Sequence, residues 1–454
     1  MARAKKGAAL TPEERLQAAL VPDWEWPYKL PENWCWIKAS SIINIYTGNS
    51  INEKVKAEKY AGQPKGLLFI ATKDIGFDNA VNYETDVRIP DYSNFKTAPA
   101  NTALLCIEGG SAGRKVGFVE QTVCFGNKLC AFATEKVNSK YIYYVLQSQC
   151  FVDQFNSKKH GLIGGVSVGD LTEIAFMIPP LAEQQRIVDR IENLFAKLDE
   201  SKEKAQVVVD SFETRKAAIL HKAFTGELTA NWREAHGVGM ESWEHHQFSD
   251  LCDIVRGGSP RPAGDPKYYD GSIPFMKVAD ITQNDSPYVS STEYSIKEAG
   301  LKKTRMVEPN TLLLTNSGAT LGVPAITTIK TTFNDGIAAF LGLAPESLLF
   351  YYYFWASKTT FLRSINMGAA QPNLNTRLIG EVEIDVPRIE EQIEIAHILD
   401  KLFMKEQQAK EVAEAVLDQI DLMKKSILAR AFRGELGTND PNDEPAVELL
   451  KKII

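Results

Sequence analysis

Residues 178–228 read IPPLAEQQRIVDRIENLFAKLDESKEKAQVVVDSFETRKAAILHKAFTGEL, and residues 386–436 read VPRIEEQIEIAHILDKLFMKEQQAKEVAEAVLDQIDLMKKSILARAFRGEL. The two stretches align without a gap at a constant offset of 208 residues, and twenty of the 51 aligned pairs are identical. This period is far longer than the roughly 20–50 residues of solenoid and propeller repeats. We therefore predict a unit made of one globular part and one long helix, duplicated in tandem.

Each repeated stretch is predicted to form a long helix that begins after Pro179 or Pro387 and ends at Gly226 or Gly434. Apolar residues recur three and four residues apart for about five heptads, which is typical of a coiled coil. The interface predicted from this spacing consists of Ile187, Ile191, Leu194, Leu198, Val208, Phe212, Ile395, Leu399, Leu402, Val416, Ile420, Met423 and Ile427. Ser201, Arg215 and Glu406 interrupt the apolar pattern.

The natural partner of each predicted helix is the other one. At ~1.5 Å per residue, the 36 residues 187–222 would span roughly 54 Å. Antiparallel pairing would set the two globular parts at opposite ends of a rod, related by an approximate two-fold axis. The alternative is that each helix packs only on its own globular part.

The globular parts have the pattern of strands and turns. Short apolar runs at 67–71, 102–107 and 116–119 are separated by Gly, Pro, Asn and Asp, and runs at 273–278 and 310–315 repeat the pattern. One helix is expected at 139–155 and another at 345–362. The predicted fold class is α+β, with two β-rich domains that alternate with two long helices.

The chain divides into six predicted segments. Thr11-Pro12-Glu13-Glu14 has the pattern of a helix start, with a capping Thr, a Pro and a Glu three residues after the cap. The segments are an amino-terminal helical and irregular segment (1–29), a first β-rich domain (30–177), a central helix (178–232), a second β-rich domain (240–385), a distal helix (386–436) and an acidic tail (437–454).

Composition excludes several classes of protein. The apolar and charged contents, 44% and 24%, are those of a folded protein, and no run reaches the ~18 apolar residues of a membrane span. The amino terminus lacks an apolar signal core, so we expect a cytoplasmic protein. The six cysteines have no CxxC spacing, which predicts isolated thiols, neither a disulfide framework nor a metal site. The net charge of −7 argues against a nucleic-acid partner, although it does not exclude a local basic surface.

The order of segments and several motifs resemble one known family. The junction 178–185, IPPLAEQQ, the helix ends 219–229, ILHKAFTGELT, and 427–436, ILARAFRGEL, and the amino-terminal stretch 20–34, LVPDWEWPYKLPENW, are similar to specificity subunits of type I restriction-modification systems. The ending 444–452, EPAVELLKK, is similar as well. The resemblance covers nearly the whole chain, which would then come from a bacterium or archaeon.

The resemblance implies a subunit without catalytic activity. Each globular part would be a target-recognition domain that reads one half of a split, asymmetric site in double-stranded DNA. The helix pair would set the gap between the halves and would dock two methyltransferase subunits. Those partner subunits would carry S-adenosylmethionine and methylate adenine N6, whereas restriction subunits would use ATP and Mg²⁺; this chain would hold no cofactor.

Three motifs that suggest other chemistry are interpreted as structural. Asp265-Pro-Lys-Tyr268 has lysine where an adenine methyltransferase tetrapeptide needs a second proline, so a turn is expected. The glycine-rich stretch 109–115 lacks the phosphate-loop pattern and a following helix, so a turn between strands is expected. The aromatic run 351–355 is expected to lie in the domain core, not to stack on bases.

Polar residues beside strand ends are the candidates for DNA contact, because loops carry function and because Arg and Lys suit guanine and phosphate while Asn and Gln suit adenine. The candidates are Lys73, Arg114, Lys115, Lys158, Lys159 and His160 in the first domain and Arg256, Arg261, Lys277, Asn316, Gln371, Asn373 and Asn375 in the second. The stretches 161–168 and 368–375 occupy equivalent positions and are predicted to be paired recognition loops; the alternative is that they are plain solvent-facing turns.

Two other classes of function stay open. A coiled-coil scaffold whose two β-rich domains bind proteins would suit the acidic net charge. A self-sufficient DNA enzyme would need methyltransferase motifs that the sequence does not supply.

Overall fold

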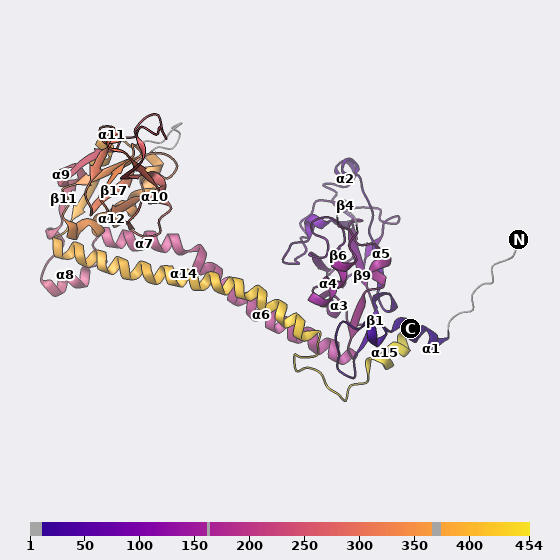
Figure 1. The fold of residues 1–454 in the computed structure, drawn as a ribbon. Helices are drawn as coiled ribbons and strands as arrows, with labels where there is room; N and C mark the ends of the chain where they lie inside the picture. Colours follow the sequence, from indigo (N-terminus) through magenta and orange to yellow (C-terminus); the bar gives the residue numbers. More distant parts are fainter. Residues whose placement is uncertain (1–10, 161–163, 366–373) are drawn as a thin grey trace. The chain divides into compact units, whose positions relative to one another are not determined.

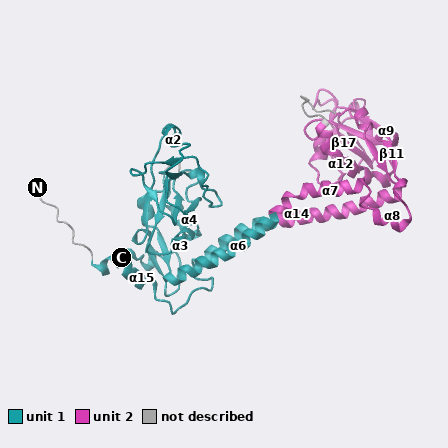
Figure 2. Ribbon diagram, turned by 180° about the vertical axis from the view of Figure 1, so that it is seen from behind, with its two compact units in different colours: residues 1–205, 415–454 teal, residues 206–414 magenta. Residues whose placement is uncertain are grey.

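The computed structural model describes residues 11–160, 164–365 and 374–454. The chain forms two compact units, of which the first comprises residues 1–205 and 415–454 and the second residues 206–414 (Figure 2). The unit boundaries fall within the repeated helical stretches. Each unit therefore contains one globular part, a piece of its own helix and a piece of the helix from the other repeat.

Unit 1 contains three small sheets, and their elements are labelled in Figure 1. The strands are β1 (Cys35–Lys38), β2 (Asn44–Thr47), β3 (Leu67–Ile70), β4 (Arg88–Ile89), β5 (Thr97–Ala98), β6 (Thr102–Cys106), β7 (Val116–Val119), β8 (Val123–Phe125), β9 (Leu129–Ala133) and β10 (Ala175–Ile178). The helices of the globular part are α1 (Pro12–Ala19), α2 (Glu53–Lys59), α3 (Ser139–Val145), α4 (Gln149–Ser157) and α5 (Val168–Thr172), with 3-10 turns η1 (Asp23–Glu25), η2 (Ala39–Ser41) and η3 (Thr72–Asp74).

Unit 2 repeats this plan. Its strands are β11 (Glu244–Gln247), β12 (Asp253–Arg256), β13 (Tyr269–Met276), β14 (Tyr288–Val289), β15 (Tyr294–Ile296), β16 (Arg305–Val307), β17 (Thr311–Thr315), β18 (Pro324–Thr327), β19 (Thr331–Phe333), β20 (Ile337–Leu341) and β21 (Glu383–Val386). Its helices are α8 (Ala230–His236), α9 (Phe248–Leu251), α10 (Val278–Thr282), α11 (Glu298–Leu301), α12 (Leu348–Ile365) and α13 (Thr376–Gly380), with η4 (Met240–Ser242) and η5 (Pro345–Ser347).

The two units share strand order and pairing, except that unit 2 has an additional edge strand, β14, beside β18. Unit 1 has the orders β2-β9-β6-β7 and β4-β3-β8-β5, and unit 2 has β12-β20-β17-β18-β14 and β15-β13-β19-β16. The pairs β3–β8 and β13–β19 are both parallel, and β1–β10 and β11–β21 are both antiparallel ribbons. The central strands β6 and β17 are buried along their whole length, as expected for apolar runs covered on both faces. The predicted strands at 67–71, 102–107, 116–119, 273–278 and 310–315 are thus present.

The repeated stretches form α6 (Leu181–Asp210) followed by α7 (Phe212–Phe224), and α14 (Ile389–Ala431). In unit 2, α12 lies between the β17–β18 strands and α7 (Figure 1). The helix ends were predicted correctly: Gly226 and Gly434 follow α7 and α14 with φ of 77° and 74°, a left-handed conformation that favours glycine. The remaining helix, α15 (Ala446–Ile453), lies in unit 1 beside α1.

The first long helix is not continuous, which corrects the prediction. Ser211 separates α6 from α7, and its hydroxyl donates a hydrogen bond to the Val207 carbonyl one turn earlier. Arg215 donates from Nη2 to the Val208 carbonyl over 3.1 Å. Such side-chain bonds to helix carbonyls bend helices. The equivalent position in the unbroken α14 is Gln419, which has no hydroxyl group to donate to the carbonyl one turn earlier.

Contacts between the helical stretches run in opposite sequence directions within each unit. In unit 1, Lys424 Nζ lies 2.5 Å from the Asp199 carboxylate, and Thr438 donates to Glu183 over 2.6 Å. In unit 2, Arg215 Nε donates to Glu406 over 2.7 Å, and Lys410 Nζ lies 4.9 Å from the Phe212 ring. Arg215 and Glu406, the polar interruptions of the two apolar patterns, are therefore partners of each other.

The predicted interface residues differ in burial. Ile187, Ile191, Ile395, Leu399 and Ile420 are buried, and the first four also belong to the cores of the globular parts. Leu194, Leu198, Val208, Phe212, Leu402 and Ile427 are half-buried. Val416 and Met423 are the most exposed of the predicted interface residues, at 37% and 47%. Met423 is the equivalent of Arg215, a position that a charged side chain occupies in the other repeat.

Two further predictions concern helices of unit 1. Thr11 caps α1 in a reciprocal capping box with Glu14, as its sequence indicates. The single helix expected at 139–155 is wrong, because the segment forms α3 and α4. Ser148 lies between them and its Oγ accepts a hydrogen bond from the Phe151 N–H, so it begins a new helix.

The cysteines and hydropathy fit the sequence analysis. All six cysteines are free thiols, and burial raises the pKa of Cys35 and of Cys130 to about 12. Within the described ranges, no helix combines the length and apolar character needed to cross a bilayer.

Candidate nucleic-acid interface

In unit 1, the loop between β6 and β7 (residues 107–115) builds one end of the sheet. Gly109 and Gly113 have φ of 81° and 75°. A Cβ atom on Gly113 would lie 2.6 Å from the Phe155 ring, so the close packing of this loop on α4 requires glycine. The loop therefore holds its last two residues, Arg114 and Lys115, in a fixed place beside η3.

The cations of this loop gather round an exposed aromatic ring. Phe77 is 61% exposed, with the Arg114 guanidinium 4.9 Å and the Lys115 ammonium 4.7 Å from its ring centroid. Lys115 also donates to the Thr72 carbonyl over 3.2 Å, which brings it next to Lys73, whose side chain is 71% exposed. Both cations lose mobility against the ring, and Arg114, which is exposed, keeps its charge available to an anion, while Lys115 is half-buried.

The end of α4 adds three more of the predicted residues. Lys158 and Lys159 follow its last turn, and Lys159 Nζ lies 5.5 Å from the Phe155 ring that supports the β6–β7 loop. His160 Nε2 lies 3.6 Å from Asp170. The Ser167 hydroxyl lowers the pKa of the Asp170 carboxyl, and the charge of His160 lowers it further. The six candidates of the first domain thus occupy neighbouring segments at one end of unit 1.

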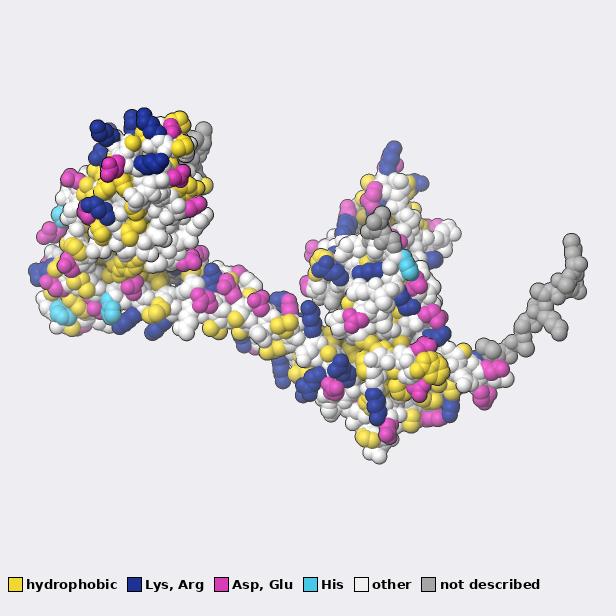
Figure 3. Space-filling model, viewed as in Figure 1, with side chains coloured by type: hydrophobic (Ala, Val, Ile, Leu, Met, Phe, Trp, Pro, Cys, Tyr) yellow, Lys and Arg dark blue, Asp and Glu magenta, His cyan; other side chains and the backbone are white. Residues whose placement is uncertain are grey.

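In unit 2, three arginines surround the turn between β19 and β20. Arg256 Nε donates to the Asp335 carbonyl over 2.6 Å, and Arg261 Nη2 lies 3.5 Å from the Asp335 carboxylate. Arg305 Nε donates to the Arg256 carbonyl over 3.0 Å. Figure 3 shows Lys and Arg side chains gathered at the end of unit 2 that lies away from α14. Arg305 and Asp335 are absent from the sequence prediction, because the fold alone brings residues 256, 305 and 335 together.

The other candidates of the second domain have separate environments. Lys277 Nζ lies 3.0 Å from the Tyr294 ring centroid. Asn375 caps α13, where its Oδ1 accepts a hydrogen bond from the Leu378 N–H over 2.9 Å. Asn316 is fully buried, and neither side-chain atom has a hydrogen-bond partner among the described residues. Asn316 was named as a polar loop residue for DNA contact, and its side chain does not reach the surface. Gln371 and Asn373 lie outside the described residues.

The predicted recognition loops lie next to the loops that follow the central strands. The Val166 N–H donates to the Ile107 carbonyl over 3.1 Å in unit 1, and the Leu374 N–H donates to the Asn316 carbonyl over 2.8 Å in unit 2. These are equivalent bonds at equivalent positions. The parts of both stretches at 161–163 and 368–373 lie outside the described residues.

The three motifs interpreted as structural have the expected conformations. Residues 265–268 form a turn, in which the Tyr268 N–H donates to the Asp265 carbonyl over 2.8 Å. Residues 109–115 connect β6 and β7 without a helix. Of the aromatic run, Tyr351, Tyr353, Phe354 and Trp355 are buried in the core of unit 2, as predicted.

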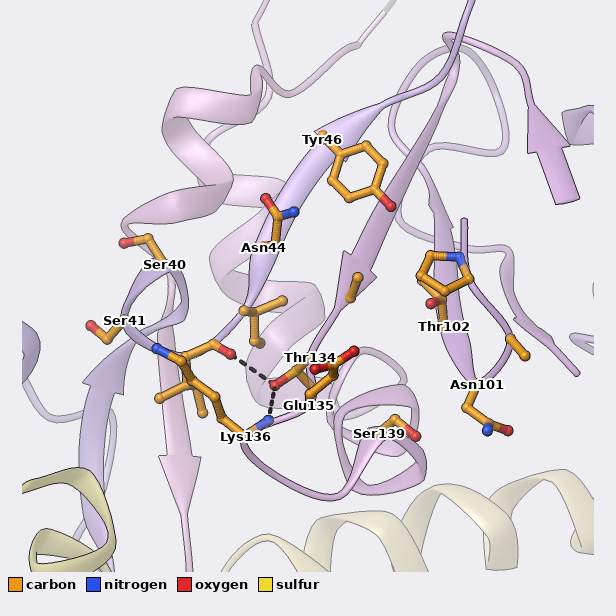
Figure 4. A pocket seen from close by; sticks show the side chains of 15 residues that line it. Ser40, Ser41, Asn44, Tyr46, Asn101, Thr102, Thr134, Glu135, Lys136 and Ser139 are labelled. Atoms are coloured by element: carbon orange, nitrogen blue, oxygen red, sulfur yellow. Dashed lines mark hydrogen bonds between the residues drawn. The ribbon is translucent and has the colours of Figure 1, made fainter. Parts of the chain in front are cut away.

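Unit 1 also has a cavity of about 850 Å³ at the other end of its sheet. Asn44, Asn101 and Thr134 line it, and the charges of Glu135 and Lys136 beside them cancel (Figure 4). The cavity therefore lacks the positive charge that a nucleic-acid interface needs, and the cation-bearing loops stay the candidate site.

Comparison with known proteins shows the family to which the chain belongs. The family described as "Type I restriction modification DNA specificity domain" matches residues 31–208 and 240–415. The chain is 24% identical to the type I restriction enzyme EcoBI specificity subunit of Escherichia coli, over 93% of this chain and 92% of that protein. It is also 24% identical to the StySPI specificity subunit of Salmonella potsdam, over 94% and 96% of the two chains.

A solved structure supports the fold. The HsdS subunit of Thermoanaerobacter tengcongensis superposes with a TM-score of 0.63 at 18% identity, over 91% of this chain and all of that one. Because the family match covers both halves of the chain, the protein belongs to the type I restriction-modification specificity subunits.

Proposed function

We propose that this chain is the non-catalytic subunit that gives a type I restriction-modification complex its DNA sequence specificity. Each unit would read one half of a bipartite, asymmetric site in double-stranded DNA. The observation that carries the proposal is the placement of cationic side chains at one end of each sheet, among which Arg114, Arg261 and Arg305 are exposed, in a chain whose family is that of specificity subunits.

The difference between the two cation sets supports an asymmetric site. Unit 1 presents Arg114 and Lys115 from the β6–β7 loop, whereas unit 2 presents Arg256, Arg261 and Arg305 around another turn. Arginine suits guanine and phosphate, and lysine suits phosphate. Units with different side chains at the same end of one fold would read different bases.

The helices support a role as a spacer. The Lys424–Asp199 contact in unit 1 and the Arg215–Glu406 contact in unit 2 fit an antiparallel coiled coil with an approximate two-fold relation between the repeats. The 43 residues of α14 would extend ~65 Å at ~1.5 Å per residue. This length exceeds the ~34–36 Å of one DNA turn, so the helix pair could hold the two reading units over separated major-groove sites.

The proposal includes two methyltransferase subunits, which would supply S-adenosylmethionine, and restriction subunits, which would supply ATP- and Mg²⁺-dependent cleavage. Exposed apolar side chains on α14, namely Val416, Leu422 and Met423 in unit 1 and Met404 and Val412 in unit 2, would serve as docking contacts. A structure similar in fold, with a TM-score of 0.66, comes from work on "complex assembly and conformational transition of the type I R-M system".

The test is co-expression of the chain with a methyltransferase subunit encoded beside it, followed by mapping of methylated adenines. A two-part motif is expected, and replacing residues 240–385 with the equivalent domain of another specificity subunit should change one half only. Methylation that ignores this swap would contradict the proposal. A chain that binds proteins through both domains and confers no methylation pattern would be the coiled-coil scaffold instead.

The spacer role has its own test. Four residues inserted into the 187–222 stretch should lengthen the preferred gap or abolish assembly, while base preference in each half stays the same. An unchanged gap would contradict the role of the helices as a spacer.

A further inference from the structure

We propose that Asp335 is a positioning residue for DNA recognition by unit 2. Its carboxylate holds Arg261 and Ser259 on the β19–β20 turn, beside Arg256 and Arg305, so that the three arginines form one preorganised cluster that binds phosphate and guanine in one half-site. This inference rests on the proposed function. It assigns a role to a carboxylate, the side chain that would ordinarily be expected to repel DNA.

Asp335 contacts two of the arginines through different atoms. Its main-chain carbonyl accepts from Arg256 Nε over 2.6 Å, and its carboxylate lies 3.5 Å from Arg261 Nη2. The other carboxylate oxygen accepts from the Ser259 hydroxyl over 2.6 Å. These bonds fix the 256–261 segment on the β19–β20 turn.

The third arginine joins the cluster through the backbone. Arg305 Nε donates to the Arg256 carbonyl over 3.0 Å, and the Thr304 hydroxyl donates to the Phe333 carbonyl over 2.7 Å. The Gly258 N–H also donates to the Phe333 carbonyl, over 3.1 Å. Residues 256–261, 304–305 and 333–335 are thus tied together at several points, which lowers the ordering cost when a ligand binds.

The guanidinium groups keep donors for an anion. Arg256 and Arg305 use Nε for the contacts within the cluster, and among the described residues their terminal nitrogens have no hydrogen-bond partner. Arg261 has a side chain that is 70% exposed. Two terminal N–H groups on one side of a guanidinium match a phosphate or the O6 and N7 atoms of guanine.

The carboxylate is kept ionised in this setting. Burial opposes its charge, but the Ser259 hydroxyl, a backbone hydrogen bond and the charges of Arg261 and Arg256 lower the pKa of Asp335 below its usual value. The ionised group offsets the mutual repulsion of three neighbouring cations. It therefore permits a denser positive surface than the arginines could form alone.

The equivalent positions in unit 1 do not form such a cluster. The residues that correspond to Arg256, Arg261 and Asp335 are Thr47, Asn52 and Asn127, and only Lys96, at the position of Arg305, is cationic. Asn52 instead caps α2, where its Oδ1 accepts from the Lys54 N–H over 2.9 Å. The shared fold therefore does not require Asp335, which points to a role in the contacts of unit 2.

The test uses the complex of the full chain with its methyltransferase subunits. Methylation rates are measured for the cognate duplex and for duplexes altered in either half, together with binding at several salt concentrations. The variants are Asp335→Ala, Asp335→Asn and Ser259→Ala. The matched control is Asp285→Asn, which removes an exposed carboxylate elsewhere in unit 2.

Asp335→Ala should lower the rate on the cognate duplex about tenfold, the size expected for one misplaced base-reading pair. It should also reduce discrimination between base sequences in the half read by unit 2. Unchanged discrimination in the other half would serve as the sign that the complex is folded and assembled. Asp335→Asn should have an intermediate effect, Ser259→Ala a smaller one, and Asp285→Asn none.

Three results would overturn the inference. If Asp335→Ala tightens binding to all duplexes, Asp335 merely repels DNA. If discrimination falls equally in both halves, Asp335 has a general structural role, and if the effect equals that of Asp285→Asn, Asp335 has no role in recognition. If the wild-type complex itself methylates without regard to sequence, the proposed function fails first, and this inference falls with it.

Discussion

Units 1 and 2 have the same strand order apart from the additional edge strand β14 of unit 2, and both have glycines of positive φ after the central strand, but they carry their positive charge at different corners of one end. In unit 1 the cations lie on the β6–β7 loop around Phe77, whereas in unit 2 they lie around Asp335 on the β19–β20 turn. Buried strands and backbone hydrogen bonds constrain the fold, while side chains at loop positions are free to differ. The comparison shows that one fold can present different charged side chains at the same end of its sheets.

A second difference lies at the two-stranded ribbons. In β1–β10, Trp36 pairs with Met177 and both are buried, whereas in β11–β21 the equivalent pair is His245 and Asp385, which is exposed. Trp36 also donates to the Tyr28 carbonyl over 3.1 Å. Residues before β1 and the carboxyl-terminal tail cover unit 1 at this place, so its ribbon carries core residues.

The largest expected effect comes from the buried carboxylates at the starts of the two long helices. Glu391 accepts from Thr229, Arg233 and Trp243, and Arg233 is itself buried. Glu391→Ala should therefore lower the free energy of unfolding of unit 2 by about 3–5 kcal/mol, because it leaves a buried cation without its partner.

The equivalent Glu183 accepts from Thr438 and from Arg186, whose side chain is 38% exposed. Glu183→Ala should cost unit 1 only about 1–3 kcal/mol. Denaturant unfolding followed by hydrogen exchange in each unit checks both values, with the Gln variants as controls. Equal losses in the two units would contradict the difference in burial.

The second prediction exchanges a pair between the repeats. Arg215 and Glu406 correspond to Met423 and Leu198. Arg215→Met alone should destabilise unit 2 by about 1–2 kcal/mol, because Glu406 stays partly buried without its partner. Adding Glu406→Leu should recover most of that loss, as apolar replacements of an ion pair often do. Thermal unfolding of the four members of this double-mutant cycle measures the coupling, and additive effects would contradict it.

The third prediction concerns Phe77. Phe77→Ala should weaken binding of the assembled complex to cognate DNA about two- to fivefold, since each cation–π contact is worth ~0.5–1 kcal/mol at an exposed site. The loss should appear in the half read by unit 1. Phe77→Tyr keeps the ring and should bind like the wild type. If Phe77→Ala instead lowers discrimination in the other half, Phe77 does not belong to the site of unit 1.

The smallest expected effect is a titration. The hydrogen bond from His245 to Asp385 raises the pKa of His245 above its usual value. Its small contribution to stability is present below the unfolded pKa of about 6.5 and is lost as pH rises through the folded value. NMR titration should show the raised value, and Asp385→Asn should return it toward the ordinary one. An unchanged titration in that variant would show that Asp385 is not the cause.

The sequence was most informative where structure depends on local pattern. Prolines at 179 and 387, glycines at 226 and 434 and the Thr11 capping box gave helix ends correctly, because caps and breakers act through neighbouring backbone atoms. Apolar runs gave the central strands. The break at Ser211 escaped prediction because a serine in a helix is common, and only its bond to the Val207 carbonyl and its contact with Arg215 make it a bend.

The candidate site was predicted in part. Lys73, Arg114 and Lys115 are close in sequence to strand ends. Arg114 and Lys115 meet at Phe77, and Lys115 also binds the Thr72 carbonyl next to Lys73. Asn316 also follows a strand, yet its side chain is buried. A position after a strand in the sequence does not determine which residues pack against the side chain. Arg305 and Asp335 were missed, since each is an ordinary exposed charge until the sheet brings it to Arg256.

Sequence alone determined that the chain is a tandem duplication of a β-rich domain and a long helix, and which family it resembles, because periodicity and local motifs are properties of neighbouring residues. Only the tertiary structure decided which charges become neighbours: Arg215 with Glu406, Arg256 and Arg261 with Asp335, and Arg305 with the Arg256 carbonyl. The physical reason is that electrostatic and packing energies depend on distance in space, and segments far apart along the chain come close to each other only when the chain folds.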